Sequence, residues 1–424
     1  MTPVLNLPSD IEAQFFALKH ASRGLRGFSD QIKSSLLLAL AARLRQDAEI
    51  VLAANAIDLK NLSAGTQAAF VDRLTLNQSR IEDMAVSLVS VSKLPDPVGE
   101  TVEERTLENG LKLRRTRAPL GVILMIFESR PNVILEAFSL AFKSGNAIAL
   151  RGGSESSQTA SAIYHLIADE LRRHEIPAEC FIGIRNYDRG LVEALLLRKD
   201  LIDVVVPRGG DKLIELVQKT ALMPIIKNDR GLCHAFVDCA ADLEMAVQVV
   251  ANAKTGRPGV CNSLETVLVH ELIAKEFLPK LYQQTRPQNL QWRCDPASRE
   301  ILKNLPHIAD AVPADWDTEH LDLIINCRVV RGLSEALSHI ETHGSKHSEA
   351  ILTSDEQAAR KFQSEVDAAA VYWNASTRFT DGYQFGLGGE LGISTQKLHV
   401  RGPVGLRELT TPRWLIDGTG QIRT

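Results

Sequence analysis

Cys261 has the sequence surroundings expected of a nucleophilic thiol. It follows the turn-forming run GRPG (256–259) and precedes residues 264–269, which are mostly apolar, rich in β-branched side chains and predicted to form a buried strand. Between a glycine-rich turn and a strand, backbone N–H groups can point at a ligand and stabilise the oxyanion that a thiolate attack creates. The alternative is a small buried core residue, the usual role of a cysteine outside a disulfide.

Two glycine-containing loops are candidates for binding a phosphate, because each closes a predicted strand and opens a helix. Ligands of parallel sheets sit outside the carboxyl ends of the strands, so two such loops are more informative than one. Either loop alone is also explained as an ordinary turn. The residues concerned are Arg151, Gly152, Gly153, Ser154 and Glu155 in the first loop, and Pro207, Arg208, Gly209 and Gly210 in the second.

Three further places carry side chains suited to polar chemistry. Asn132 follows a predicted strand and can donate an N–H to an oxyanion, while Arg130 nearby can hold a carboxylate or phosphate; a helix cap explains the pair equally well. Residues 374–382 (NASTRFTDG) are dense in small donors around Arg378, which suits a small polyanion or a surface turn. Glu319 precedes an apolar strand, where an exposed charge is the ordinary explanation.

The composition is that of a globular protein with more than one domain. The chain has 424 residues, 45% of them hydrophobic, which is enough to bury a large core. The formal net charge of −4 predicts no general attraction to nucleic acid or to anionic membranes. There is no apolar run of about 18 residues, and the N-terminal stretch lacks the basic-then-apolar order of a secretory signal. The six cysteines are scattered without metal-site spacing, so reduced thiols in the cytoplasm and no bound metal are expected.

Hydrophobic periodicity predicts two α/β domains. The first hundred residues look helical, and Ile32, Leu36, Leu40 and Leu44 recur at the spacing of one buried helix face. Strands predicted at 121–127, 146–151 and 201–207 alternate with helices, an order typical of a doubly wound parallel sheet that binds a dinucleotide. A second alternating series includes the strand after Cys261. We therefore assign residues 1–100 and 118–232 to a dinucleotide-binding domain and 233–398 to a catalytic domain.

A separate arm is predicted between the helices and the first parallel strand. Residues 101–117 read as a β-hairpin around Asn109–Gly110, the preferred pair for a two-residue turn. The arms are polar and charged, so the hairpin does not belong in a core. Together with the tail at 399–424, it is expected to form an oligomerisation arm.

Taken together, these motifs resemble the aldehyde dehydrogenase superfamily over nearly the whole chain. The matching strings are ESRPNV (128–133), LRGGSE (150–155), VPRGG (206–210), CHAFVD (233–238), RPGVCN (257–262), TEHLDLI (318–324) and NASTRFTDG (374–382). The most specific string is FGLGGELGISTQKLHVRGPVG (385–405). Within the superfamily it resembles the reductases that act on an acyl phosphate of glutamate.

The resemblance implies a role for each candidate residue. Cys261 becomes the nucleophile, and Asn132 forms the oxyanion hole with the backbone N–H of Cys261. Glu319 holds the nicotinamide ribose, and the two glycine-containing loops face NADP(H). The implied substrate-binding residues are Ser129, Arg130, Asn262, Ser376, Thr377 and Arg378.

The reaction implied by the resemblance is the NADPH-dependent reduction of L-glutamyl 5-phosphate to L-glutamate 5-semialdehyde and phosphate through a cysteine thioester. This is the second step of proline synthesis from glutamate. The implied partners are this small-molecule substrate, further copies of the chain in a dimer or tetramer, and a functionally coupled glutamate 5-kinase.

Two other classes of protein remain open on the sequence. One is a hydrolytic aldehyde dehydrogenase, which needs a carboxylate base to activate water near the cysteine. In the corresponding stretch, residues 227–231, the only carboxylate is Asp229, and Arg230 follows it directly. The other is a binding protein that kept the fold and lost the chemistry, against which the presence of both Cys261 and Asn132 argues.

Overall fold

The structure, a computed structural model, describes residues 7–63, 65–128, 130–228 and 230–423. The chain forms two compact units: unit 1 is Met1–Asn228, Gly386–Gly392 and Val404–Thr424, and unit 2 is Asp229–Phe385 and Ile393–Pro403. The division into cofactor domain, arm and catalytic domain stays a prediction. Ser129 and Asp229, both singled out from the sequence, lie outside the described residues. No helix of the described ranges is long and apolar enough to cross a membrane.

Unit 1 begins with helices, as predicted. They are α1 (Ser9–Gly24), α2 (Asp30–Gln46), α3 (Ala48–Lys60), α4 (Ala68–Leu74) and α5 (Gln78–Ser92). Asn77 caps α5 by accepting a hydrogen bond from the N–H of Arg80. The helix α2 packs against α5, and α3 packs against α7 of the sheet layer described below.

The predicted buried face of α2 is wrong at its first position. Leu36, Leu40 and Leu44 are fully buried, but Ile32 is 41% exposed. A step of four residues overshoots one helical turn by about 40°, so a strict four-residue repeat drifts off the core face. At that end of α2 the buried residue is Lys33 instead. Its Nζ is 2.6 Å from the carboxylate of Asp96.

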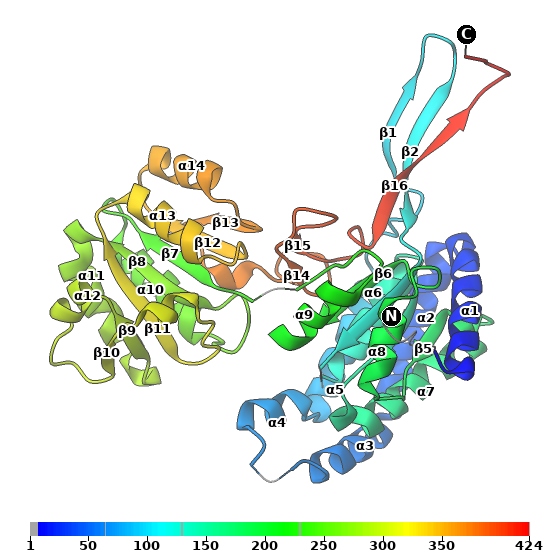
Figure 1. Ribbon diagram of the computed structural model, residues 1–424, viewed down its shortest axis with the longest axis horizontal. Helices are drawn as coiled ribbons and strands as arrows, with labels where there is room; N and C mark the ends of the chain where they lie inside the picture. The colour runs from blue at the N-terminus through cyan, green and yellow to red at the C-terminus, as the bar shows by residue number, and fades with distance from the viewer. Residues whose placement is uncertain (1–6, 64, 129, 229, 424) are drawn as a thin grey trace, which may run out of the picture. The chain divides into compact units, whose positions relative to one another are not determined.

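The first parallel sheet has the strand order β5-β4-β3-β6 and belongs to unit 1. Figure 1 labels β5 and β6 of this sheet. Its strands are β3 (Val122–Phe127), β4 (Ala147–Arg151), β5 (Phe181–Gly183) and β6 (Val204–Arg208), and every residue of β3 is buried. The connecting helices are α6 (Asn132–Lys143), α7 (Ser157–Arg173), α8 (Arg189–Leu196) and α9 (Asp211–Thr220). The sequence predicted this sheet without β5 and α8, since β5 is too short for its own periodicity to register.

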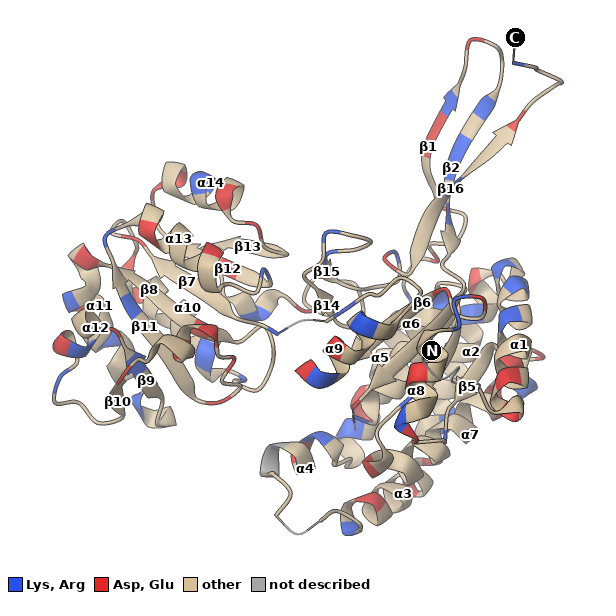
Figure 2. Cartoon of the chain, viewed as in Figure 1, with Lys and Arg blue, Asp and Glu red and all other residues tan. Residues whose placement is uncertain are grey.

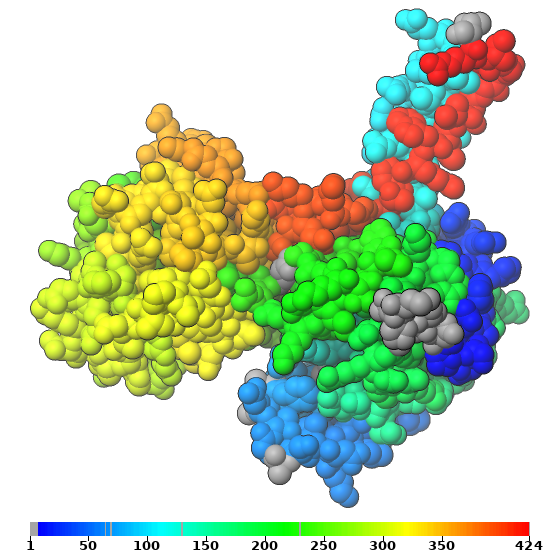
Figure 3. Space-filling view, in the orientation of Figure 1, coloured from blue at the N-terminus to red at the C-terminus, as the bar shows by residue number. Residues whose placement is uncertain are grey.

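The loop of the hairpin is longer than predicted, and a third strand pairs with the hairpin. β1 (Thr101–Thr106) pairs with β2 (Lys112–Pro119), and the N–H of Leu107 donates to the carbonyl of Leu111, so the connecting loop exceeds a two-residue turn. β16 (Thr410–Asp417) pairs antiparallel with the other edge of β2, which Figure 3 shows as the red tail lying along the cyan hairpin. Figure 2 shows the mixed charges on the arms.

Unit 2 contains the second parallel sheet, with strand order β10-β9-β11-β8-β7-β12-β13. Its strands are β7 (Cys233–Val237), β8 (Leu264–His270), β9 (Gln291–Cys294), β10 (Ile308–Asp310), β11 (Ile324–Val330), β12 (Ser348–Leu352) and β13 (Ala370–Trp373). The helices are α10 (Leu243–Thr255), α11 (Glu271–Thr285), α12 (Pro296–Ile301), α13 (Leu333–His343) and α14 (Glu356–Glu365), and a short pair, β14 (Ile393–Ser394) with β15 (Gly402–Pro403), completes it. All seven residues of β8 are buried, so the turn before this strand is anchored on a rigid element.

Candidate active site

Cys261 lies in the turn that enters β8, at the amino end of the sheet of unit 2. Its side chain is half-buried, whereas Cys180, Cys233, Cys294 and Cys327 are buried. The thiol of Cys233 donates to the carbonyl oxygen of Cys261 at 3.3 Å. Burial raises the pKa of Cys233 well above its ordinary value, which keeps it a neutral donor, and of these two thiols Cys261 is the more accessible.

Gly231 fits directly against the backbone of Cys261. A Cβ at this position would lie 1.6 Å from the carbonyl oxygen of Cys261, so only glycine allows the approach. The N–H of Gly231 donates to Oε1 of Glu319 at 2.8 Å. Glu319, predicted as a cofactor ligand, is therefore brought to the loop that supports the cysteine.

The segment 374–382 is also brought to the cysteine turn. Asn262 donates its Nδ2 to the carbonyls of Thr380 (2.8 Å) and Arg378 (3.3 Å), and the hydroxyl of Thr377 donates to the carbonyl of Asn262 at 2.8 Å. Ser376 accepts from the N–H of Arg378. The hydroxyls of Ser376 and Thr377 therefore position this loop. The Oδ1 of Asn262 is buried and has no hydrogen-bond partner among the described residues.

A buried ion pair beneath these loops was missed by the sequence reasoning. Nζ of Lys254, at the end of α10, lies 3.0 Å from Oε2 of Glu265 in β8, and both side chains are at most 1% exposed. Burial lowers the pKa of Lys254 and raises the pKa of Glu265 to about 7, although each partner opposes the other's shift. The carboxylate of Glu265 also helps to raise the pKa of Cys233, and the carboxylate of Glu319 helps to raise the pKa of Glu265. A glutamate inside the apolar run LETVLVH was the signal that would have found the pair.

In unit 1, Asn132 is the first residue of α6 and its side chain is exposed. Among the described residues no side-chain hydrogen bond caps this helix, so the structure gives no support to the capping explanation of Asn132. Arg130 lies in the preceding turn, where its carbonyl accepts from the N–H of Val133. Asn132 thus presents an amide at a helix N-terminus, directly after the carboxyl end of a central strand.

The loop after β6 is tied to the loop after β3 within unit 1. The N–H of Gly210 donates to Oε1 of Glu128 at 2.6 Å, and a Cβ on Gly209 would lie 2.8 Å from the same oxygen. Nη1 of Arg208 is 3.8 Å from the carboxylate of Glu136 and 3.5 Å from the carbonyl of Leu391. The side chain of Arg208 therefore contacts other residues of the protein, and its role in cofactor binding stays a prediction.

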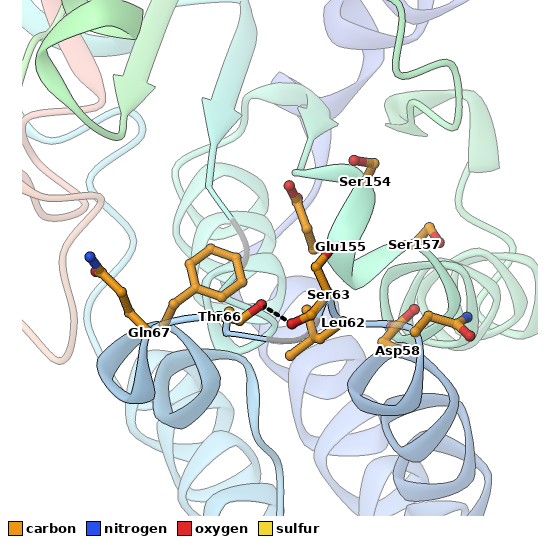
Figure 4. Close-up of a pocket in the computed structure, with 10 residues that line it drawn as sticks. Asp58, Leu62, Ser63, Thr66, Gln67, Ser154, Glu155 and Ser157 are labelled. Carbon is orange, nitrogen blue, oxygen red and sulfur yellow. Dashed lines mark hydrogen bonds between the residues drawn. The ribbon is translucent and has the colours of Figure 1, made fainter.

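The loop after β4 borders a cavity of about 510 Å³, drawn in Figure 4. Ser154, Glu155 and Ser157 line it on one side, and Asp58, Ser63, Thr66 and Gln67 line it on the other. The lining residues that the structure describes include no lysine or arginine. Arg151 lies at the start of the loop, donates Nη2 to the carbonyl of Tyr187 at 2.8 Å, and keeps a buried Nε without a partner among the described residues.

One cluster with metal-ligand chemistry lies at the opposite, carboxyl end of the sheet of unit 2. Donor atoms of Asp238, Cys239 and His270 all lie within 4.8 Å of one another. Two of these groups already have protein partners, since Asp238 accepts from the hydroxyl of Thr353 at 2.7 Å and Nδ1 of His270 accepts from the N–H of Leu272 at 3.2 Å. An accepting Nδ1 leaves the proton on Nε2, which disfavours metal coordination by that nitrogen.

Comparison with known proteins gives a consistent picture. The model of the aldehyde dehydrogenase family matches residues 8–298. The gamma-glutamyl phosphate reductase of Moorella thermoacetica is 47% identical over 420 residues, 99% of this chain and 100% of that protein. The crystal structure of gamma-glutamyl phosphate reductase from Thermotoga maritima has a TM-score of 0.93 and 44% identity, covering 97% of this chain and 99% of that one. An engineered glycolyl-CoA reductase with bound NADP⁺ shares the fold at a TM-score of 0.69 and 15% identity, over 95% of this chain and 96% of that one.

Proposed function

This chain belongs to the aldehyde dehydrogenase family and, within it, to the gamma-glutamyl phosphate reductases, and from that premise we propose that it reduces L-glutamyl 5-phosphate to L-glutamate 5-semialdehyde and phosphate with NADPH. The reaction serves proline biosynthesis from glutamate. The observation that carries the proposal is the half-buried thiol of Cys261, held in a turn by the close fit of Gly231 and the hydrogen bonds of Asn262.

The proposed mechanism uses a covalent thioester on Cys261. The thiolate forms a bond to the acyl carbon, the bond from that carbon to the phosphate oxygen breaks, and phosphate leaves with the electron pair. Asn132 and the backbone N–H of Cys261 stabilise the oxyanion. When bound, the reduced nicotinamide supplies the hydride for the thioester carbon. Release of the aldehyde then restores the thiol.

The residues after β4 fit the phosphate-bearing half of such a cofactor. Arg151 has a buried Nε without a partner among the described residues, and an unsatisfied buried donor is costly unless a ligand accepts from it. Burial also lowers the pKa of this guanidinium, which a nearby anion would counteract. We assign Arg151 to the 2′-phosphate that distinguishes NADPH from NADH. Glu319 remains the residue proposed to hold the nicotinamide ribose.

Replacing Arg151 by alanine is expected to lower kcat/KM for NADPH about tenfold or more, because a hydrogen bond to a charged group is lost. The value for NADH should change far less, since NADH lacks the 2′-phosphate. The control is Arg185→Ala, which removes an exposed arginine of the same unit. Equal losses with both cofactors would refute this role for Arg151.

The three-stranded arm is proposed to contact a second copy of this chain in a dimer or tetramer. Trp414 and Ile416 are 41% and 60% exposed, and their pairing with Arg115 and Leu113 places them on one face of the arm. Such a strip of apolar side chains on a thin sheet gains stability only when another surface covers it.

A glutamate at Ile416 is expected to give smaller particles by light scattering, because it would bury a charge in the contact. The matched control is Thr411→Glu on the opposite face of the same strand, which should leave the oligomer intact. Truncation near residue 399 is unsuitable, because it would also remove the buried Val404 and Leu409. An unchanged particle size for Ile416→Glu would contradict the proposed contact.

Functional coupling to a glutamate 5-kinase and a cytoplasmic location complete the proposal. All six cysteines are thiols, as a reducing compartment favours.

A coupled assay with glutamate, ATP, a glutamate kinase and NADPH tests the activity. Consumption of NADPH should require ATP and the kinase. Folded protein that consumes none under these conditions would overturn the proposed function.

A further inference from the structure

Arg378 is a half-buried cation without an ion-pair partner. No carboxylate of the described residues lies within 4.0 Å of its guanidinium. Its backbone is nevertheless firmly placed, because its carbonyl accepts from Asn262 and the neighbouring Thr377 donates to the carbonyl of Asn262. The chain thus holds the backbone of Arg378 beside the turn of Cys261, while the described residues offer its guanidinium no ion pair.

Arg257 brings a second positive charge to the same place. It is exposed in the turn that leads from α10 to Cys261, and the described residues give it no ion pair either. Burial lowers the pKa of Arg378, and the charge of Arg257 lowers it further. The thiols of Cys261 and Cys233 and the carboxylate of Asp381 act in the opposite direction, which places both thiols within electrostatic reach of Arg378.

Two like charges held near each other, with no carboxylate of the described residues in ion-pair contact with either, form an unfavourable arrangement that a bound anion relieves. The pair favours an anion with two negative charges, because a dianion neutralises two guanidinium groups better than a single carboxylate does. The planar fork of arginine also fits phosphate oxygens through paired hydrogen bonds. Arg257 was not among the binding residues predicted from the sequence.

We propose that Arg257 and Arg378 together bind the phosphoryl group of the acyl phosphate, and inorganic phosphate when the reaction runs in reverse. This inference rests on the proposed function and adds the part of the substrate that the pair holds. As the bond from Cys261 Sγ to the acyl carbon forms, the carbon–oxygen bond breaks and its electron pair stays on phosphate. The two guanidinium groups lie where that charge collects and stabilise it.

The test measures phosphate binding without substrate or cofactor. Cys261 is alkylated with iodoacetamide in the presence of increasing inorganic phosphate, and its modification is followed by mass spectrometry of the peptide. In the unmodified protein, phosphate should slow alkylation. In Arg257→Gln and Arg378→Gln the phosphate concentration that halves the rate, relative to each variant's own rate without phosphate, should rise about tenfold or more.

Controls separate the outcomes. Arg331→Gln removes an 83% exposed arginine at the other end of the sheet and should bind phosphate as the unmodified protein does. Thermal unfolding checks the fold, and the exposed Arg257 gives a usable variant even if Arg378→Gln is unstable. The proposal would be overturned if phosphate protected Arg257→Gln as well as it protects the unmodified protein, or if it did not protect the unmodified protein. It would also be overturned if the two variants lost only the protection given by glutarate, a dicarboxylate without a phosphoryl group. Because no glutamyl phosphate is present, failure here is distinct from failure of the coupled assay.

Discussion

The substitution Cys261→Ala is expected to abolish turnover while leaving fold and cofactor binding intact. In the proposed mechanism the reaction passes through a covalent bond to this sulfur, and no other side chain of the turn offers a nucleophile of the same strength. The substitution removes only the sulfur atom of a half-buried side chain, so it should cost little stability. NADPH oxidation in the coupled assay measures the loss, and tryptophan fluorescence with added NADPH measures cofactor binding.

The other cysteines serve as controls for this result. Cys239, exposed beyond the carboxyl end of β7, should be replaceable by serine with full activity. Cys233→Ala should have an intermediate effect, because its thiol supports the carbonyl of Cys261 from below. If Cys261→Ala turned over near the rate of the unmodified protein, Cys261 would not be the nucleophile.

Replacing Asn132 by alanine is expected to lower kcat by about 10²–10³, because loss of one oxyanion donor typically costs that much. Binding of substrate should change little, since the oxyanion exists only after attack. Steady-state kinetics separate the two effects.

The contrast with Asn77 sharpens this test. Asn77 caps α5 through its side chain, whereas the part of the chain that the structure describes shows no cap made by Asn132. Asn77→Ala should therefore lower stability by about 1 kcal/mol and leave kcat unchanged. If Asn132→Ala raised KM alone, Asn132 would be a binding residue and the oxyanion assignment would fail.

Much of the fold could be predicted from the sequence because its strands are long and apolar. The central strands β3 and β8 are buried on both faces, and such runs are visible without any tertiary information. Short elements were missed for the converse reason: β5 and β10 each contain three residues, too few for a period to appear. The exposure of Ile32 shows the same limit, because spacing alone cannot decide which residue of a turn faces the core.

The residues of the site could be predicted from separate sequence motifs, but their arrangement in space could not. The sequence singled out Cys261 and residues 374–382 independently, and only the fold shows that Asn262 joins them. Arg257 and the pair Lys254–Glu265 were missed because their significance depends on burial and on neighbours distant in sequence. Local patterns carry no information on such neighbours.

The protection of the thioester from water is the central claim of the account. Hydrolytic members of the family need a carboxylate base to activate water, and residues 227–231 contain no glutamate. Glu319 is brought near the cysteine turn, but its Oε1 accepts the N–H of Gly231. We therefore propose that water does not release the acyl group and that phosphate does so when the reaction runs in reverse.

The most direct measurement is therefore the oxidation of L-glutamate 5-semialdehyde by NADP⁺ with and without inorganic phosphate. NADPH formation is expected to depend strictly on added phosphate, and phosphate-free buffer should allow at most one turnover per Cys261. Sustained NADPH formation in phosphate-free buffer would show that a water-activating base exists, and would identify a hydrolytic aldehyde dehydrogenase instead.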